Sequence, residues 1–281
     1  MERLARIAAI NDLSGFGRCS LTVALPVLSA MGFQACPVPT AVLSAHTGYE
    51  EPYICDFSAH IEPYLRHWDA MPLTFEGVFT GYLGNEGQVT ALLPFMQYQQ
   101  KNGALCVVDP VMADNGRLYA TCTPALVAGM RRLVALADVT TPNLTEACLL
   151  TGMDYAACLD GTVSIETVGE KMAALGCRQT VITGVPGENG TLGNVAFDHD
   201  TGERFCVSVP RLDRSYAGTG DVFSAVLCGR RTAGSSLRTA VEDAAAFVRV
   251  ATEYTAARAL PEQDGIVFEP FLGRLAREMA E

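Results

Sequence analysis

The segment Gly218-Thr219-Gly220-Asp221 combines residue types that suit phosphoryl transfer, and it leads into a predicted helix over 221–230. Glycine has no Cβ, so the backbone at Gly218 and Gly220 can turn several N–H groups toward one point. The N-terminus of a helix adds partial positive charge there, which suits an anion. These amides could stabilise a transferring phosphoryl group while Asp221 accepts the proton of an attacking hydroxyl. A helix cap is the alternative role for an aspartate at this position.

Other polar residues follow short apolar segments, which predict buried strands. They are Asp12, Thr80-Gly81-Tyr82, Asp109, 141–146 and Thr183. The carboxyl ends of parallel strands share one edge of a sheet, and open α/β sheets bind ligands at that edge. Carboxylates suit Mg²⁺ and an amide cradle suits phosphate, so this edge predicts a site for a Mg²⁺-nucleotide. The chain contains no GxxxxGK[ST] sequence, which excludes a P-loop enzyme.

Some of these polar positions also have simpler explanations. Asp12 could form an Asx turn or cap a helix. Asn143 and Glu146 have the spacing of a capping box. The glycine-containing turn over 15–20 half-matches a dinucleotide-binding fingerprint, but Ser20 replaces its third glycine and no acidic residue ends the second strand. A dinucleotide oxidoreductase is therefore disfavoured.

Two polar segments have the composition of ligand-contacting loops. The segment 40–53 contains His46, Thr47 and Tyr49, which can hydrogen-bond to and stack on a flat ring. A single histidine is more often structural, so both roles stay open for His46. The glycine-containing segment 113–119 is either an ordinary connection or a mobile lid.

The pattern of apolar residues, glycines and prolines places these segments in an α/β domain. It predicts strands over 7–10, 33–38, 77–80, 105–108, 138–141 and 181–183, an antiparallel pair over 192–197 and 204–209, and helices over 20–31, 57–68, 86–100, 124–137, 163–175, 221–230, 237–258 and 268–278. Strands that alternate with helices are typical of a parallel sheet. Neither an internal repeat nor an interdomain linker is visible, so we expect a single domain over 1–281.

The composition limits the class of protein further. Of the 281 residues 49% are hydrophobic and 18% are charged, which is enough for a large buried core. The net charge is −11 and no run of Lys or Arg occurs, which argues against nucleic acid or an anionic membrane as a partner. No apolar run reaches the ~20 residues of a membrane span, and the first apolar run is too short for a signal peptide.

The ten cysteines indicate a reducing compartment. They form no CxxC pair, and most of them lie in apolar segments. This distribution favours cysteines that serve as small core residues over disulfides or a metal site. We therefore expect a cytoplasmic protein.

In their order along the chain, the motifs resemble those of the ribokinase-like kinases and, among them, the pyridoxal (vitamin B6) kinases. The resemblance covers nearly the whole chain. The segment 218–221 resembles the anion hole and catalytic aspartate of that family, and 44–49 resembles the segment that closes over the pyridine ring. The segment 81–84 matches the family motif whose tyrosine packs on the substrate, and 109–112 is similar to the strand end near the metal and phosphates. The segment 143–146 matches the N-x-x-E motif for Mg²⁺-phosphate. The segment 114–119 falls where the family has its ATP-covering lid.

The resemblance implies a three-layer α/β/α sandwich with a mostly parallel central sheet. Such kinases are usually dimeric, and many respond to K⁺. The implied reaction is ATP-dependent phosphorylation of the 5′-hydroxymethyl group of pyridoxal, pyridoxine or pyridoxamine. The resemblance implies Asp221 as the base, with the backbone of Gly218, Thr219 and Gly220 around the transferring group. It implies a vitamin pocket formed by Asp12, Thr40, His46, Thr47 and Tyr82, and an ATP site formed by Asp109, Asp114, Tyr119, Asn143, Thr183 and Thr219. Mg²⁺ would lie near Asp109 and Glu146, through water.

One departure keeps an alternative substrate open. Many pyridoxal kinases carry serine where this chain has Asp12, and the segment 11–17 looks more like the D-x-S-G-G start of the hydroxymethylpyrimidine kinases of thiamine synthesis. His46-Thr47 favours B6 vitamers, because the pyrimidine kinases commonly have an acid there. A non-catalytic vitamin- or nucleotide-binding protein of the same fold is the alternative from another class, although the intact 218–221 segment argues against it.

Overall fold

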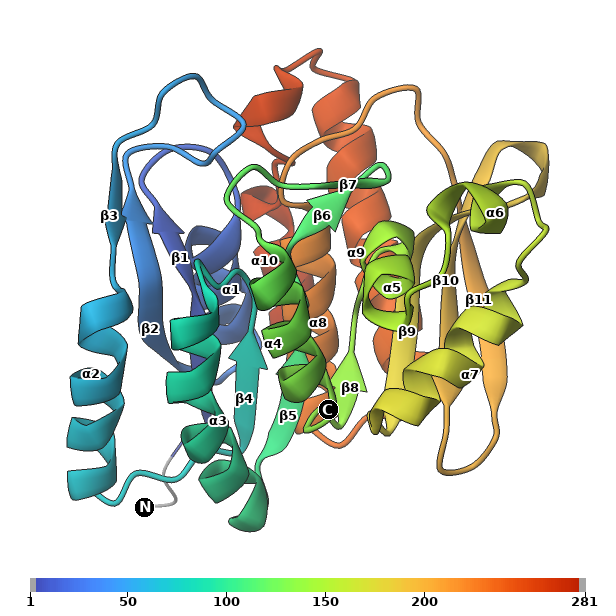
Figure 1. Cartoon of the computed structure of the whole chain (residues 1–281). Coiled ribbons are helices and arrows are strands. Elements are labelled where there is room, and N and C mark those ends of the chain that lie inside the picture. The colour runs from blue at the N-terminus through green and yellow to red at the C-terminus, as the bar shows by residue number, and fades with distance from the viewer. Residues whose placement is uncertain (1–3, 278–281) are drawn as a thin grey trace.

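A computed structural model describes residues 4–277 of the chain, and its centre is a large twisted sheet (Figure 1). The strands of this sheet are β1 (Arg6–Ser14), β2 (Gln34–Leu43), β3 (Ile54–Asp56), β4 (Gly77–Thr80), β5 (Leu105–Val108), β8 (Val139–Thr140), β9 (Gln179–Pro186), β10 (Thr191–Asp198) and β11 (Arg204–Pro210). Their spatial order is β11-β10-β9-β8-β5-β4-β1-β2-β3. The six strands from β2 to β9 in this order pair in parallel, whereas β3, β10 and β11 are antiparallel at the two edges.

Helices cover both faces of the sheet (Figure 1). They are α1 (Ser20–Ala30), α2 (Ser58–Ala70), α3 (Glu86–Lys101), α4 (Pro124–Val134), α5 (Leu144–Thr151), α6 (Tyr155–Leu159), α7 (Ile165–Leu175), α8 (Thr219–Thr232), α9 (Leu237–Ala256) and α10 (Leu272–Arg277). The core packing shows two faces: α1, α8, α9 and α10 pack on one, and α2, α3 and α4 pack on the other. The predicted three-layer α/β/α sandwich with a mostly parallel sheet is therefore confirmed.

Strand β1 shows why the middle of the sheet was readable from sequence. Ile7 and Ala9 pack into the core beneath α1, α8 and α9, while Ala8 and Ile10 pack into the core beneath α2, α3 and α4. All four residues are fully buried. A parallel strand covered on both faces appears in sequence as a continuous apolar run instead of an alternating one.

Several predicted boundaries were wrong. The turn predicted after residue 12 starts later, because β1 continues to Ser14 and pairs with an equally extended β2. The helix predicted from 221 is α8 and already begins at Thr219. The segment 113–119 contains a hairpin of β6 (Ala113–Asp114) and β7 (Arg117–Leu118). The helix predicted over 268–278 is a 3₁₀ turn followed by α10, and residue 278 lies outside the described residues.

The cysteines divide between core and surface. Cys19, Cys106, Cys148, Cys177 and Cys228 are buried, which agrees with the prediction that cysteines serve as core residues. Two others, at positions 55 and 206, are exposed on edge strands, so that prediction does not extend to all ten. Across residues 4–277, no helix has the length and apolar character needed to cross a membrane.

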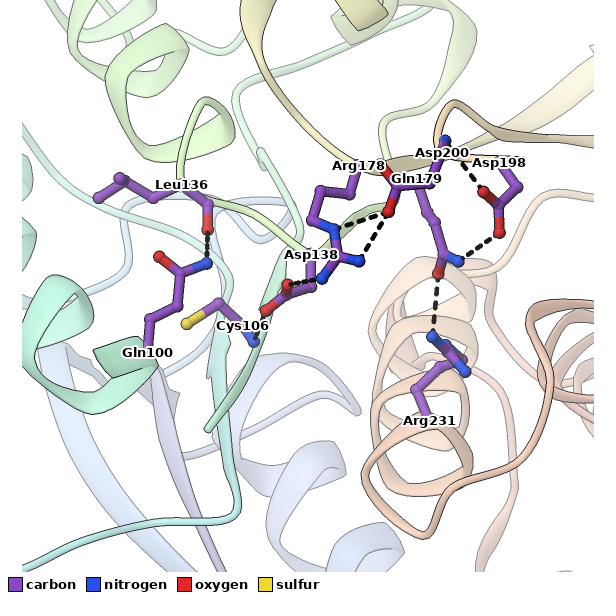
Figure 2. A network of polar contacts seen from close by, with 9 residues as sticks. All are labelled: Gln100, Cys106, Leu136, Asp138, Arg178, Gln179, Asp198, Asp200 and Arg231. Atoms are coloured by element: carbon purple, nitrogen blue, oxygen red, sulfur yellow. Dashed lines mark hydrogen bonds and ion pairs between the residues drawn. The ribbon is translucent and has the colours of Figure 1, made fainter. Parts of the chain in front are cut away.

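A polar network fixes the C-terminal end of α8 at the edge of the sheet where its parallel strands begin (Figure 2). Arg231 near the end of α8 donates to Gln179 on β9 (3.1 Å), and Gln179 donates to Asp198 on β10 (2.6 Å). The neighbouring Arg178 pairs with Asp138 (3.2 Å) and with Asp200 (2.6 Å). The helix that carries Asp221 in its first turn is thus anchored to the sheet at its opposite end.

Candidate active site

The start of α8 forms the centre of the site. Gly218 is the N-cap and has φ +76°, a left-handed conformation that side chains rarely adopt. A Cβ at Gly218 would lie 1.9 Å from the carbonyl oxygen of Arg18, so this close approach also requires glycine. Gly220 differs, because its backbone is helical and a Cβ there would meet open space. Glycine at 220 therefore keeps space free beside the helix N-terminus, and the predicted backbone flexibility is needed only at 218.

Asp221 lies in the first turn of α8 and is not its cap. The pKa of Asp221 is raised to about 6: burial is the main cause and the charge of Asp12 adds to it, while hydrogen bonds from the Ser20 backbone and the Asn11 amide oppose the shift. The Asn11 Nδ2 group lies 3.4 Å from Asp221 Oδ1. A carboxylate with a pKa near 6 is ionised at neutral pH and is still a proton acceptor of useful strength.

Asp109 follows β5 on the same sheet edge and is only 5% exposed. Its pKa is raised to about 8: burial is the main cause, the charge of Asp221 adds to it, and the hydrogen bond from the Ser224 hydroxyl on α8 opposes the shift. Ser224 also shares a hydrogen bond of 2.9 Å with Thr141 at the end of β8. Two acids, Asp109 and Asp221, therefore face each other where a cation or a proton would relieve their repulsion.

Glu146 is held by backbone N–H groups on both of its carboxylate oxygens. Oε2 accepts from Asn143 (2.9 Å), and Oε1 accepts from Met112 (3.1 Å) and Ala113 (3.5 Å). Asn143 caps α5 and accepts from the Glu146 backbone, so the capping box predicted as the simpler explanation is present. Burial raises the pKa of Glu146 well above its ordinary value, and Asp109 adds to the shift. Glu146 thus fastens the base of the 113–119 hairpin to α5.

These acids fit Mg²⁺ only with ligands from outside the protein. Within residues 4–277 there is no group of three or more His, Cys, Asp or Glu side chains that could hold a metal. Asp109 is a buried carboxylate without a cationic partner among the causes of its pKa shift, and Glu146 is already engaged by three backbone donors. Mg²⁺ commonly takes one or two carboxylates and completes its shell with water and substrate phosphates. This donor set matches that pattern, and Asp109 is the carboxylate that is not already bound by backbone donors.

The hairpin over 113–119 places two predicted ATP ligands at the surface. Asp114 accepts from the backbone and the side chain of Asn115 (2.8 and 2.9 Å) and is exposed. Tyr119 is 40% exposed, and burial of its hydroxyl with the nearby acid Glu146 raises its pKa. The hydroxyl of Thr145 in the first turn of α5 accepts from the Gly116 backbone (2.9 Å), which ties the hairpin tip to the start of α5. The hairpin is therefore docked on α5 at both its base and its tip.

The ends of β8 and β9 bring two more predicted ATP ligands together. Asn143 and Thr183 form an isolated parallel bridge, and the Thr183 backbone donates to Pro142 (2.9 Å). Both side chains are half-buried. Thr219, predicted for the same site, donates its hydroxyl to Tyr216 at 3.3 Å. The predicted nucleotide residues thus come from the carboxyl ends of neighbouring strands and from the first turn of α8.

The residues predicted for the vitamin pocket include Asp12 on β1, Thr40 on β2 and Tyr82 just after β4. Asp12 is 6% exposed and accepts from the Ser14 hydroxyl (2.8 Å); burial raises its pKa, and hydrogen bonding from Ser20 opposes the shift. Thr40 is fully buried and donates to the Tyr82 carbonyl (2.9 Å). Tyr82 is half-buried. The Thr40 hydroxyl thus holds the Tyr82 backbone and is not open to a ligand.

His46 and Thr47 lie in the loop between β2 and β3, and the charge of His46 acts on Asp12. The Nδ1 of His46 accepts from Gly48 (3.0 Å), which assigns the proton to Nε2, and Nε2 donates to the Gln263 carbonyl (2.6 Å). Tyr49 donates to Asp264 (2.6 Å) on the same segment. Both ring nitrogens of His46 are engaged by backbone, so the ring can offer a ligand its face but no further hydrogen bond. Thr47 is exposed.

Three residues that touch this site were not singled out from sequence. Asn11 is an amide buried within an apolar strand, which is the one signal that could have drawn attention to it. Ser20 has a positive φ of 52° at the start of α1, and Ser224 is a buried hydroxyl inside α8. Neither of the last two has a motif that marks it.

The buried charge on Asp109 predicts a gain of stability in Asp109→Asn. Because the pKa of Asp109 is higher in the folded than in the unfolded protein, its ionisation destabilises the fold. This destabilisation is absent below about pH 4, grows as the pH rises and is complete above about pH 8. In metal-free protein at pH 9 we expect the variant to gain about 2–3 kcal/mol, or roughly 5–10 °C in Tm. Thermal unfolding at pH 4 and pH 9 checks this, with the exposed Asp69→Asn as the matched control. An equal Tm change at both pH values would contradict the assignment of a buried charge.

The chain is similar to proteins of known class over most of its length. The family model described as phosphomethylpyrimidine kinase matches residues 25–264. The crystal structure of pyridoxal kinase from Lactobacillus plantarum has a TM-score of 0.90 and 31% identity over 98% of either chain. A Bacteroides thetaiotaomicron protein, crystallised in an orthorhombic form with pyridoxal, has a TM-score of 0.91 and 36% identity over 97% of this chain and 96% of its own. The pyridoxine/pyridoxal/pyridoxamine kinase of Bordetella avium is 30% identical over 264 residues, which are 86% of this chain and 82% of its own.

Fold, site and similarities together define a phosphotransferase of the ribokinase-like superfamily. The chain belongs to the phosphomethylpyrimidine kinase family, and pyridoxal kinases are among its relatives. The resemblance and the enzyme class predicted from the sequence are thereby confirmed. The roles assigned to individual residues stay predictions.

Proposed function

We propose that this enzyme transfers the γ-phosphoryl group of ATP to the 5′-hydroxymethyl group of pyridoxal, pyridoxine and pyridoxamine. The observation that carries the proposal is the position of Asp221, directly behind the open N-terminus of α8 and on the same sheet edge as Asp12 and Asp109. The names of the relatives from Lactobacillus plantarum and Bordetella avium support B6 vitamers as substrates. Pyridoxal in the crystals of the Bacteroides thetaiotaomicron protein supports them as well.

The chemistry follows from the geometry of these residues. Asp221 takes the proton of the substrate hydroxyl, since its carboxylate is ionised above about pH 6. The backbone amides at 218–220 face the transferring phosphoryl group and stabilise its charge. Asp109 is the residue that would hold Mg²⁺, and the ion would supply charge neutralisation for the phosphates. Glu146 acts on the metal site indirectly, by holding the backbone at 112–113 and the hairpin over the nucleotide.

A second candidate substrate is hydroxymethylpyrimidine. The family model carries the name phosphomethylpyrimidine kinase, and Asp12 supplies an acid next to the pocket that could pair with an aminopyrimidine. Steady-state assays with Mg-ATP and each of pyridoxal, pyridoxine, pyridoxamine and hydroxymethylpyrimidine distinguish the two. Preferred turnover of B6 vitamers supports our proposal. Turnover of the pyrimidine alone would assign the enzyme to thiamine synthesis, and binding without turnover of any substrate would favour the non-catalytic alternative.

Asp12 predicts a preference among the B6 vitamers. Its carboxylate would attract the 4′-ammonium group of pyridoxamine but not the 4′-aldehyde of pyridoxal, and charged hydrogen bonds contribute about 1.5–3 kcal/mol. We expect the ratio of kcat/KM for pyridoxamine to that for pyridoxal to fall about tenfold in Asp12→Ser. Ser14→Ala, which removes the hydroxyl that donates to Asp12 but keeps the charge, is the control. Equal kcat/KM values for the two vitamers, unchanged by Asp12→Ser, would remove the preference.

We extend the proposal to the setting of the enzyme. A homodimer is expected from the family resemblance, and cytoplasmic B6 salvage is the process that such a kinase would serve. The net charge of −11 and the lack of a basic cluster in the sequence support small molecules as the partners, with neither nucleic acid nor membrane involved. Light scattering of the purified chain would test the dimer.

A further inference from the structure

Two hydrogen bonds are among the causes that lower the pKa of Asp221, one from the Ser20 backbone and one from the Asn11 side chain. Asn11 lies in β1, is 1% exposed and directs its Nδ2 group at Asp221 Oδ1 across 3.4 Å. In sequence the two residues are 210 positions apart. This contact joins the first strand of the sheet to the helix that carries the proposed base.

The orientation of the Asn11 amide is fixed by its other hydrogen bonds. Its Oδ1 accepts from the backbone N–H of Asp12 (3.0 Å) and from that of Tyr82 (2.8 Å). A flipped amide would set its NH₂ group against those two donors, so only the observed orientation satisfies all the groups. The NH₂ group must therefore point at Asp221.

The side chain of Asn11 packs closely against the backbone of Gly81. A Cβ on Gly81 would lie 2.2 Å from Asn11 Nδ2, so the glycine after β4 leaves the space that the side chain fills. The two donors to Asn11 Oδ1 belong to Asp12 and Tyr82, both of which border the proposed vitamin pocket. The amide thus connects the backbone of the pocket to the base.

We propose that Asn11 is a positioning residue for Asp221, an inference that rests on the proposed role of Asp221 as the base. The amide holds Oδ1, so that the other carboxylate oxygen is presented to the substrate hydroxyl. The amide N–H group also favours the ionised form of Asp221, whereas the surrounding acidic groups disfavour it. The titratable groups that face this carboxylate are Asp12, Cys19, Asp109 and Tyr119. None of the four is a cation, which leaves the amide NH₂ and the Ser20 N–H to favour the ionised base.

Asn11→Asp is the sharpest test, because the new carboxylate keeps an acceptor for Asp12 and Tyr82 while an oxygen replaces the NH₂ group that faces Asp221. We expect kcat at pH 7 to fall by about 10- to 100-fold, with the KM for ATP within about twofold. The acidic limb of the kcat–pH profile should move upward by at least one pH unit, because two facing carboxylates share a proton. Asn11→Ser removes the amide without adding a charge and should lower kcat about tenfold with a smaller shift, which keeps the test open if the aspartate variant does not fold.

Gln99→Glu is the matched control. Gln99 is also a 1% exposed amide that accepts from one backbone N–H (Phe75) and donates elsewhere, to Leu73, but it lies in α3 away from Asp221. The same change from amide to acid there should lower the Tm and leave the acidic limb of kcat in place. A double-mutant cycle completes the design: in the Asp221→Asn background, Asn11→Asp should cause no further loss of kcat.

The pKa of Asp221 can also be measured without any substrate. Carboxyl ¹³C NMR, with the Asp221 signal assigned by its loss in Asp221→Asn, should show a higher pKa in Asn11→Asp and Asn11→Ser than in the unaltered protein. An unchanged Asp221 pKa together with an unchanged acidic limb would overturn the inference, and so would additive losses in the cycle. Failure of the proposed function is a separate result, namely no phosphorylation of any B6 vitamer by the unaltered enzyme.

Discussion

Replacing Asp221 by alanine should lower kcat for B6 vitamers by a factor on the order of 10²–10⁴, the range expected for the loss of a general base. Binding of ATP should change little, because the amides at 218–220 remain and the repulsion between positions 221 and 109 is relieved. Steady-state kinetics measures the first effect, and calorimetric titration with ADP and Mg²⁺ measures the second. The unaltered enzyme should lose kcat below about pH 6, where Asp221 becomes protonated.

The control for this variant is an aspartate outside the site. Asp69 is exposed near the end of α2, so Asp69→Ala should leave kcat within about twofold of the unaltered value. Turnover by Asp221→Ala at the unaltered rate would exclude Asp221 as the base. A parallel loss of ADP binding would instead indicate that the start of α8 had been disrupted.

The strands could be predicted from the sequence where burial requires a run of apolar residues. Strands β4 and β5 were predicted with their observed boundaries, because both are covered on two faces and appear as uninterrupted apolar runs. Strand β3 was missed because all three of its residues are exposed at the sheet edge and carry no such pattern. The β6–β7 hairpin had a usable signal, since Asn115-Gly116 both have positive φ and Asn-Gly is the preferred two-residue hairpin turn.

Only those parts of the site whose residues are close together in sequence could be predicted. Gly218 and Asp221 belong to one short motif, and Asn143 with Glu146 forms a capping box that the spacing had predicted. Spacing could not reveal that the same Glu146 side chain reaches back 34 residues to Met112. The contact of Asn11 with Asp221 depends on α8 packing beside β1, and no local pattern encodes it.

The two glycines at the start of α8 predict opposite effects on stability and similar effects on catalysis. Gly218→Ala should destabilise the protein by about 1–3 kcal/mol, because its Cβ overlaps the Arg18 carbonyl and φ is +76°. It should also lower kcat on the order of 10²–10³-fold, since the displaced amide no longer faces the phosphoryl group. Gly220→Ala should instead gain a few tenths of a kcal/mol, because its backbone is helical and its Cβ is unobstructed.

The free space beside Gly220 is what makes that second variant informative. If the transferring phosphoryl group occupies this space, the added methyl group should lower kcat at least tenfold in a protein that melts no earlier than the unaltered one. Gly273 is the matched control, because it is also the second residue of a helix, α10, with open space around a Cβ. Gly273→Ala should leave kcat within about twofold. Full activity in Gly220→Ala would mean that phosphate does not approach this side of the helix, and the amide cradle would then be confined to residues 218 and 219.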